Sequence, residues 1–277
     1  DYNAGHYEGA VFFFDKYAQG YPQSSRLSEA CFNIAESYYY LEQYDQAAVF
    51  YKKAQDLSKE PRSTVNALVG SGWSYLKAEK SDEALKALSE AQSFAKVSNI
   101  PEDDILLGKA SLFVSRGAHK DALANYSELI ERFPKSARLA EAYLGRANTY
   151  YLLNDYPGAI RDYKRIIEVF SADPQFQKTV EKAQFGLAWT YLKDGALDQS
   201  IESFKGVLEK TESKTVKVSA LTQIGDAYQE AGRTDKAIET YDKILKEMPD
   251  TPYSDYVQYR LGVALLKVNR VDAALLS

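Results

Sequence analysis

Small, aromatic and polar positions recur along the chain at a nearly fixed spacing. The segments YEGAVFFF, YDQAAVFY, SDEALKAL, HKDALANY, YPGAIRDY, LDQSIESF, TDKAIETY and VDAALLS align on one small residue, which we call the anchor. The anchors are Ala10, Ala47, Ala84, Ala122, Ala159, Ser200, Ala237 and Ala274. They stand 37, 37, 38, 37, 41, 37 and 37 residues apart. Such a regular period predicts an array of structural repeats.

The positions around each anchor predict a helix–turn–helix unit. Twelve residues before the anchor stand Ala35, Gly72, Ala110, Ala147, Ala188, Gly225 and Gly262. Four residues after it stand Phe14, Tyr51, Leu88, Tyr126, Tyr163, Phe204 and Tyr241. Small residues let two helices approach closely, and a large side chain one turn along fills the space beside them. Pro22, Pro134 and Pro249 follow three of these segments, where a helix has to end.

This pattern resembles the tetratricopeptide repeat over essentially the whole chain, although the common unit of that family has 34 residues and most units here have 37. The resemblance implies an all-α fold, a right-handed superhelical solenoid with about six complete and two partial units and about fifteen helices. We expect residues 1–277 to form a single solenoid that is a fragment of a longer protein. The longest interval contains FSADPQFQKTVEKA, which suggests a hinge near residues 171–180 or only a longer turn.

Composition and motifs exclude several classes of function. The net charge is −5 without a basic cluster, which argues against nucleic-acid binding, and no apolar run is long enough for direct membrane insertion. His6 and His119 both precede second helices as turn residues, and the sequence contains no metal-binding, nucleophile or phosphate-loop motif. The glycines of VGSGWSYL (69–76) belong to a first helix. We therefore expect no enzyme activity, no cofactor and no metal, whereas the single Cys31 leaves the redox compartment open.

The resemblance also implies that the first helices line a concave groove that binds protein or peptide segments. The candidate groove residues are Phe32, Tyr39, Tyr40, Trp73, Asn148, Tyr151, Phe185 and Trp189. Trp73 and Trp189 occupy the same repeat position, so they are either binding residues or fillers between neighbouring first helices. Leu144 stands where family members that bind acidic chaperone tails have a lysine, which argues against that ligand.

Three turns share a short sequence pattern: GYPQSSRLSEA, RFPKSARLAEAY and EMPDTPYSDYVQY. This junction is similar to bacterial cell-envelope tetratricopeptide proteins, such as the outer-membrane β-barrel-assembly lipoprotein and the periplasmic coordinator of the Tol–Pal system. It implies a periplasmic or outer-membrane-associated scaffold. The alternative is a cytoplasmic adaptor or regulator, such as a secretion chaperone or the sensing arm of a signalling protein. Self-association through open solenoid ends is a further expectation.

Overall fold

The computed structural model describes residues 6–277, and these residues are helical throughout, with no strand among them. The fifteen α-helices of this part of the chain are α1 (Tyr7–Gly20), α2 (Leu27–Tyr40), α3 (Tyr44–Leu57), α4 (Pro61–Lys77), α5 (Ser81–Val97), α6 (Asp103–Ser115), α7 (His119–Arg132), α8 (Leu139–Leu152), α9 (Tyr156–Phe170), α10 (Gln177–Lys193), α11 (Leu197–Lys210), α12 (Lys214–Glu230), α13 (Thr234–Glu247), α14 (Ser254–Lys267) and α15 (Val271–Leu276). A short 3₁₀ helix, η2 (Pro174–Phe176), precedes α10.

The anchors fix the helix boundaries. Every odd-numbered helix begins three residues before its anchor, as α3 begins at Tyr44 for the anchor Ala47. Every even-numbered helix ends seven residues before the next anchor, as α2 ends at Tyr40. A turn of three residues therefore joins each first helix to its second helix. This confirms the helix–turn–helix unit predicted from the repeat.

Each of these turns contains one residue in the left-handed backbone region, five positions before the anchor. These residues are Glu42, Glu79, Gly117, Asn154, Gly195, Gly232 and Asn269, with φ between 58° and 78°. In the second turn the backbone N–H of Lys80 donates to the Tyr75 carbonyl at 2.8 Å, and that of Glu79 donates to the Leu76 carbonyl at 3.2 Å. This pattern ends a helix by satisfying its last carbonyl groups. Glycine adopts it without strain, whereas Glu42 and Glu79 adopt it at a cost.

The predicted small and large positions form the core. The anchor Ala47 and the earlier Ala35 are both fully buried, and Tyr51, four residues after the anchor, is only 2% exposed. The side chains of these three residues belong to one apolar cluster. The same three positions are buried in the following complete repeats, for example at Ala147, Ala159 and Tyr163, but Gly262 and Ala274 of the last unit are only partly buried. Close helix contact at the small residues is thus the reason for the conserved spacing within the chain.

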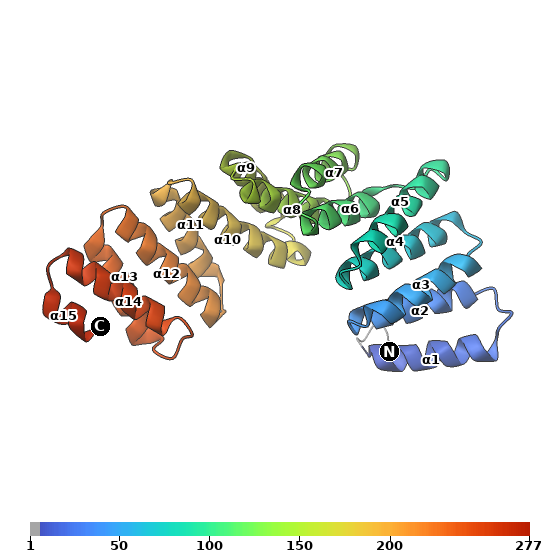
Figure 1. Cartoon of the computed structure of the whole chain (residues 1–277), viewed down its shortest axis with the longest axis horizontal. Coiled ribbons are helices and arrows are strands. Elements are labelled where there is room, and N and C mark those ends of the chain that lie inside the picture. Colours follow the sequence, from blue (N-terminus) through green and yellow to red (C-terminus); the bar gives the residue numbers. More distant parts are fainter. Residues whose placement is uncertain (1–5) are drawn as a thin grey trace. The chain divides into compact units, whose positions relative to one another are not determined.

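The chain divides into two compact units, the first ending at Gly145 and the second beginning at Arg146. In the first unit each helix packs against the next from α1 to α7 (Figure 1), and the first helices α2, α4 and α6 also contact one another in that order. In the second unit α9 to α15 pack in chain order, and α12 contacts α14. The single solenoid over the whole chain and the hinge near 171–180 stay predictions.

The segment proposed as a hinge lies within the second unit and is folded. It comprises a turn, η2 and the beginning of α10. The rings of Phe170 and Phe176 pack edge to face with their centroids 4.8 Å apart, and Asp173 Oδ1 accepts the backbone N–H of Gln175 at 3.0 Å. Among the helices of residues 6–277, none has the length and apolar composition of a membrane span.

Candidate functional site

A cavity of about 570 Å³ lies on the first unit, where α2, α4 and α6 come together. Four of the predicted groove residues line it: Phe32, Tyr39 and Tyr40 from α2, and Trp73 from α4. Phe32 packs edge to face on the Tyr51 ring, with the centroids 5.4 Å apart. Tyr40 is 53% exposed. The cavity therefore presents aromatic surface that a bound segment could cover.

Helix α4 contributes a continuous stripe to this cavity. The stripe consists of Arg62, Asn66, Val69, Trp73 and Lys77, spaced four, three, four and four residues apart. Residues three and four apart lie on one face of a helix, so all five side chains face the same side. The stripe begins and ends with a cation, and the amide of Asn66, Val69 and the indole of Trp73 lie in between.

The carboxylates that line the cavity have partners within the chain. They belong to Glu36, Asp103, Asp104 and Glu141. The Tyr51 hydroxyl donates to Glu36, and Ser136 Oγ donates to Asp103 at 2.5 Å. Arg138 donates from Nε to Asp104 at 2.5 Å and lies 3.6 Å from a carboxylate oxygen of Glu141. Asp104 and Glu141 thus share a cation, whereas the hydroxyls that donate to Glu36 and Asp103 carry no charge.

One pair of positions, fifteen residues apart, decides which side chain the groove displays in each repeat. The first member stands eleven residues before the anchor and the second stands four residues after it. Three repeats show a hydrogen bond from a tyrosine to a polar residue: Tyr51 to Glu36, Tyr163 to Asn148 and Tyr241 to Asp226. A fourth repeat has Tyr126 and Ser111 at these positions. In the two other repeats the second member is Leu88 or Phe204, which has no hydroxyl, and the first member is Trp73 or Trp189. Tryptophan therefore stands where the second helix offers no hydrogen bond.

The hydroxyls of Tyr163 and Tyr241 remain hydrogen-bond donors at neutral pH, because the pKa of each is raised. Burial raises the pKa of Tyr163 to about 12. Burial and the bond to the Asp226 carboxylate also raise the pKa of Tyr241, although Arg260 acts in the opposite direction. A protonated phenol donates to the acceptor fifteen residues earlier, so the acceptor is held against its own repeat.

Trp73 and Trp189 differ in their surroundings. In the second unit, the Trp189 and Phe185 rings both pack edge to face on Phe204, with centroid distances of 6.2 and 5.6 Å. In the first unit, Trp73 packs against the cluster that contains Leu106 and also lines the cavity. Trp73 thus fits both interpretations drawn from the sequence: it packs against a neighbouring helix, and part of its side chain faces the cavity.

The structure brings four of the eight predicted groove residues to one cavity, and the other four lie in the second unit. There Asn148 Oδ1 accepts the Tyr163 hydroxyl at 2.5 Å, and the Tyr151 ring lies 5.9 Å from that of Tyr156. The prediction omitted Arg62 and Lys77. The signal was present in the sequence, because both lie at multiples of a helical turn from Trp73.

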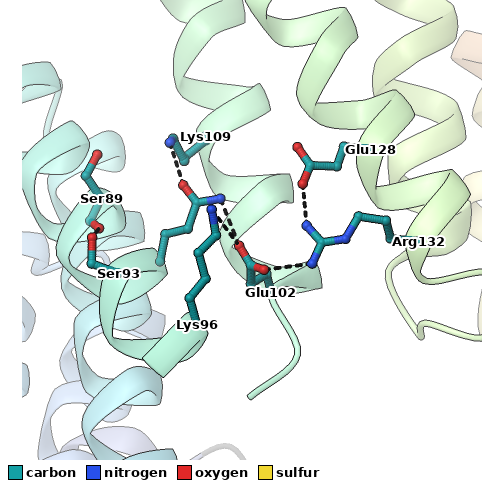
Figure 2. A network of polar contacts seen from close by, with 8 residues as sticks. Ser89, Ser93, Lys96, Glu102, Lys109, Glu128 and Arg132 are labelled. Atoms are coloured by element: carbon teal, nitrogen blue, oxygen red, sulfur yellow. Dashed lines mark hydrogen bonds and ion pairs between the residues drawn. The ribbon is translucent and has the colours of Figure 1, made fainter. Parts of the chain in front are cut away.

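A buried carboxylate fixes the helix that completes the cavity (Figure 2). Glu102 precedes α6, directly before Asp103, and its side chain is 5% exposed. It accepts hydrogen bonds from Arg132 at 2.8 Å and from Gln92 at 2.9 Å. Burial by itself would raise the pKa of Glu102, but these bonds and the charges of Arg132 and Lys96 outweigh it and lower the pKa. The network therefore ties α6 to α5 and α7.

The side chains that line the cavity can bind a partner through apolar contacts and hydrogen bonds. Within residues 6–277 no group of three or more His, Cys, Asp or Glu side chains is arranged to hold a metal ion. The cavity residues are aromatic, aliphatic, amide and charged side chains. Such a surface suits the recognition of a polypeptide segment.

Comparison with known proteins identifies the repeats. The family model described as a tetratricopeptide repeat-like domain matches residues 64–265, and that of the tetratricopeptide repeat matches residues 28–61. An uncharacterised protein of Treponema pallidum is 32% identical over 82 residues. That match covers 28% of this chain and 16% of the other protein, so the chain matches only a small part of this relative.

Solved structures share the fold at low sequence identity. A tetratricopeptide repeat protein from Parabacteroides merdae has a TM-score of 0.60 and 20% identity, with 90% of both chains covered. The apo form of RapI has a TM-score of 0.74 and 14% identity, covering 90% of this chain and 74% of the other. A signal-transduction ATPase from Pyrococcus horikoshii with a tetratricopeptide repeat sensor has a TM-score of 0.74 and 15% identity, covering 97% of this chain and 45% of the other. These likenesses concern the fold alone.

Proposed function

Because the chain belongs to the tetratricopeptide-repeat family, we propose that it is a non-enzymatic scaffold that binds a segment of a partner protein in the cavity between α2, α4 and α6. The family fold generally serves protein–protein interaction. The observation that carries the proposal is the cavity of about 570 Å³ lined by Phe32, Tyr40 and Trp73. Aromatic side chains in a recessed surface are frequent anchors of protein interfaces.

The local geometry supports binding in the first unit. Asn148 and Trp189 in the second unit are engaged by Tyr163 and Phe204 of their own repeats. At the cavity, Tyr40 stacks on the Tyr7 ring but is still 53% exposed, and Trp73 lines the open cavity. A partner side chain of apolar character would bury this surface, at about 25 cal/mol for each Å² removed from water.

We further propose that the protein is a scaffold of the bacterial cell envelope, located in the periplasm or at the outer membrane. The support is the sequence pattern of the turns at Pro22, Pro134 and Pro249, which is similar to that of envelope tetratricopeptide proteins. A cytoplasmic adaptor or regulator is the competing proposal. Cell fractionation of the full-length protein, with a periplasmic and a cytoplasmic marker protein on the same gel, separates the two.

The binding proposal is tested by site-specific photo-crosslinking in the cells that make the protein. A photoreactive amino acid is placed at Tyr40 or at Trp73, and the matched control position is Lys53, which is exposed on α3 and does not line the cavity. We expect the same partner protein to be crosslinked from both cavity positions and not from Lys53. The partner is then identified by mass spectrometry.

Two outcomes would contradict the proposal. One is a partner that crosslinks equally from Lys53, because binding would then not be specific to the cavity. The other is the absence of any specific adduct from Tyr40 and Trp73 while the protein is folded by circular dichroism. In that case the cavity aromatics serve packing alone.

A further inference from the structure

The beginning of α6 and the turn before it form one wall of the cavity. Every residue from 100 to 105 lines the cavity except Glu102. The Glu102 side chain is 5% exposed and points toward Arg132 of α7 and Lys96 of α5, as Figure 2 shows. A residue that does not face the cavity therefore stands in the middle of the wall that does.

The two carboxylate oxygens of Glu102 connect this wall to two different helices. Oε1 accepts from Nη2 of Arg132 in α7 at 2.8 Å, and Oε2 accepts from Nε2 of Gln92 in α5 at 2.9 Å. Oε1 of Gln92 in turn accepts from Nζ of Lys109, which belongs to α6, at 2.9 Å. Nζ of Lys96 lies 3.9 Å from Oε2 of Glu102. The carboxylate thus holds the beginning of α6 against both of its neighbours in the chain.

The side of the wall that faces the cavity is held by the next two carboxylates. Ser136 Oγ donates to Asp103 at 2.5 Å, and Arg138 Nε donates to Asp104 at 2.5 Å. Both donors lie in the turn between α7 and α8. Three consecutive acidic residues therefore fix the wall, Glu102 from behind and the other two from the cavity side.

Backbone packing contributes less at this wall than elsewhere in the first unit. Among consecutive helices from α1 to α7, α5 and α6 have the least extensive contact, and residues 98–102 separate them in the chain. Buried hydrogen-bond networks are rigid when all of their members are satisfied. The Glu102 network therefore supplies contacts between α5 and α6 that close helix packing supplies for the other pairs.

We infer that Glu102 is a positioning residue for the cavity: its hydrogen bonds hold the α6 wall at the distance from α2 and α4 at which a partner segment fits. This inference rests on the proposed function and names a residue that keeps the binding surface formed. Glu102 does not contact the partner itself. Its loss displaces the wall, so that fewer molecules have a formed cavity.

Glu102→Gln tests this positioning role. Glutamine has one acceptor oxygen where the carboxylate has two, so it cannot accept from both Arg132 and Gln92. Arg132→Gln is a second variant, which breaks the same network from α7. The matched control is Glu128→Gln, because Glu128 also pairs with Arg132 but is 42% exposed and does not line the cavity.

Trp73 reports the position of the wall without knowledge of the partner. The chain has two tryptophans, so Trp189→Phe leaves Trp73 as the only source of indole fluorescence. A Cβ on Gly108 of α6 would lie 3.6 Å from Cε2 of Trp73, so a displaced α6 uncovers the indole to acrylamide. Ile34→Val removes a buried methyl group outside the cavity lining and controls for a general loss of stability.

We expect Glu102→Gln and Arg132→Gln to raise the acrylamide quenching constant of Trp73 at pH 7 in chains that are folded by circular dichroism. Glu128→Gln and Ile34→Val should leave it unchanged. In cells, the two network variants should lower the yield of partner crosslinked from Tyr40 by about threefold or more, because apparent affinity falls with the fraction of competent molecules. If Glu102→Gln does not fold, Arg132→Gln decides the outcome.

The contrary outcomes separate the inference from the proposed function. An unchanged quenching constant in the network variants, or an equal rise in Ile34→Val, would overturn the inference. Increased quenching with undiminished crosslinking from Tyr40 would also overturn it and would leave the proposed function standing. If the wild type gives no specific adduct from Tyr40 or Trp73, the proposed function is wrong and the inference fails with it.

Discussion

The hydroxyl of Tyr163 donates a 2.5 Å hydrogen bond to Oδ1 of Asn148, fifteen residues earlier in the chain. The same pair of repeat positions joins Tyr241 to Asp226 at 2.5 Å. The acceptors differ in their environment: Asn148 is exposed, whereas Asp226 is buried and also accepts from Tyr256 at 3.0 Å and from Arg260 at 2.9 Å. The same repeat position therefore forms a solvent-exposed hydrogen bond at Asn148 and a buried hydrogen-bond network at Asp226.

Substituting these two tyrosines by phenylalanine should have unequal effects. In Tyr163→Phe water can replace the lost donor at Asn148, so we expect a loss of about 0.5–1 kcal/mol in the free energy of unfolding. In Tyr241→Phe the buried Asp226 loses one of its donors, and we expect about 1–3 kcal/mol. Both residues lie in the second unit, so urea unfolding followed by circular dichroism compares them directly. Equal losses would show that burial of the acceptor is not decisive.

Glu102 predicts an acid-dependent step in the stability of the first unit. Its pKa is lowered in the folded chain, so its contribution to stability is complete above the pKa of the unfolded state, about 4.3, and is lost as the pH falls through the lower folded value. We expect Glu102→Gln to reduce the fall in thermal stability below about pH 4.3. Thermal unfolding between pH 3 and pH 7 measures this, and an unchanged slope would contradict it.

The matched control for this experiment is Glu128→Gln. Glu128 also pairs with Arg132, but its side chain is 42% exposed, against 5% for Glu102. At pH 7 we expect the exposed substitution to cost less than about 1 kcal/mol. The buried one should cost about 1–3 kcal/mol, because Arg132 and Gln92 lose a charged acceptor.

Glu42 and Glu79 occupy turn positions at which the backbone favours glycine. Both have φ of 60°, where three equivalent turns have glycine. We expect Glu42→Gly and Glu79→Gly each to raise the free energy of unfolding by about 0.5–1 kcal/mol, because removing Cβ relieves the left-handed strain. Glu79→Ala keeps the Cβ and should give no gain. Thermal unfolding of the three variants checks this, and a gain with alanine would assign the effect to the lost charge.

Close approach predicts opposite results for two helical glycines of the second unit. A Cβ on Gly186 would lie 2.6 Å from Cζ of Tyr163, whereas one on Gly206 would meet nothing within 4 Å. We therefore expect Gly186→Ala to destabilise by about 1–3 kcal/mol and Gly206→Ala to stabilise by about 0.5–1 kcal/mol. Urea midpoints of both variants provide the measurement. Stabilisation by both would mean that the Tyr163 ring can move away at little cost.

The period of the anchors predicted the helix–turn–helix units and their small and large core positions, because the small contact positions and the turn geometry repeat together. The cavity could not be predicted in the same way. The sequence places Trp73 and Trp189 at one equivalent position, but only the structure shows that Phe185 and Trp189 both pack on Phe204. Whether an aromatic side chain is free to contact a partner depends on the contacts that it already makes within the chain. The position of a residue in the repeat does not predict these contacts.

The pairing of positions also allows packing and binding by Trp73 to be separated. Leu88 is fully buried and faces Gly108 of the next repeat. At the equivalent position Gly145 leaves room for the Tyr126 ring, and Gly186 leaves room for the Tyr163 ring. Trp73→Asn with Leu88→Tyr would therefore rebuild the pair seen between Asn148 and Tyr163.

In this double-variant cycle, Trp73→Asn alone should cost about 2–4 kcal/mol, because it leaves a gap above Leu88. Leu88→Tyr alone should also destabilise, since its ring would meet the indole. The double variant should recover about 1–3 kcal/mol relative to the sum, measured by urea unfolding. It should still fail to crosslink the partner through Tyr40, because the indole is absent. Recovered stability together with recovered crosslinking would show that Trp73 acts through packing alone.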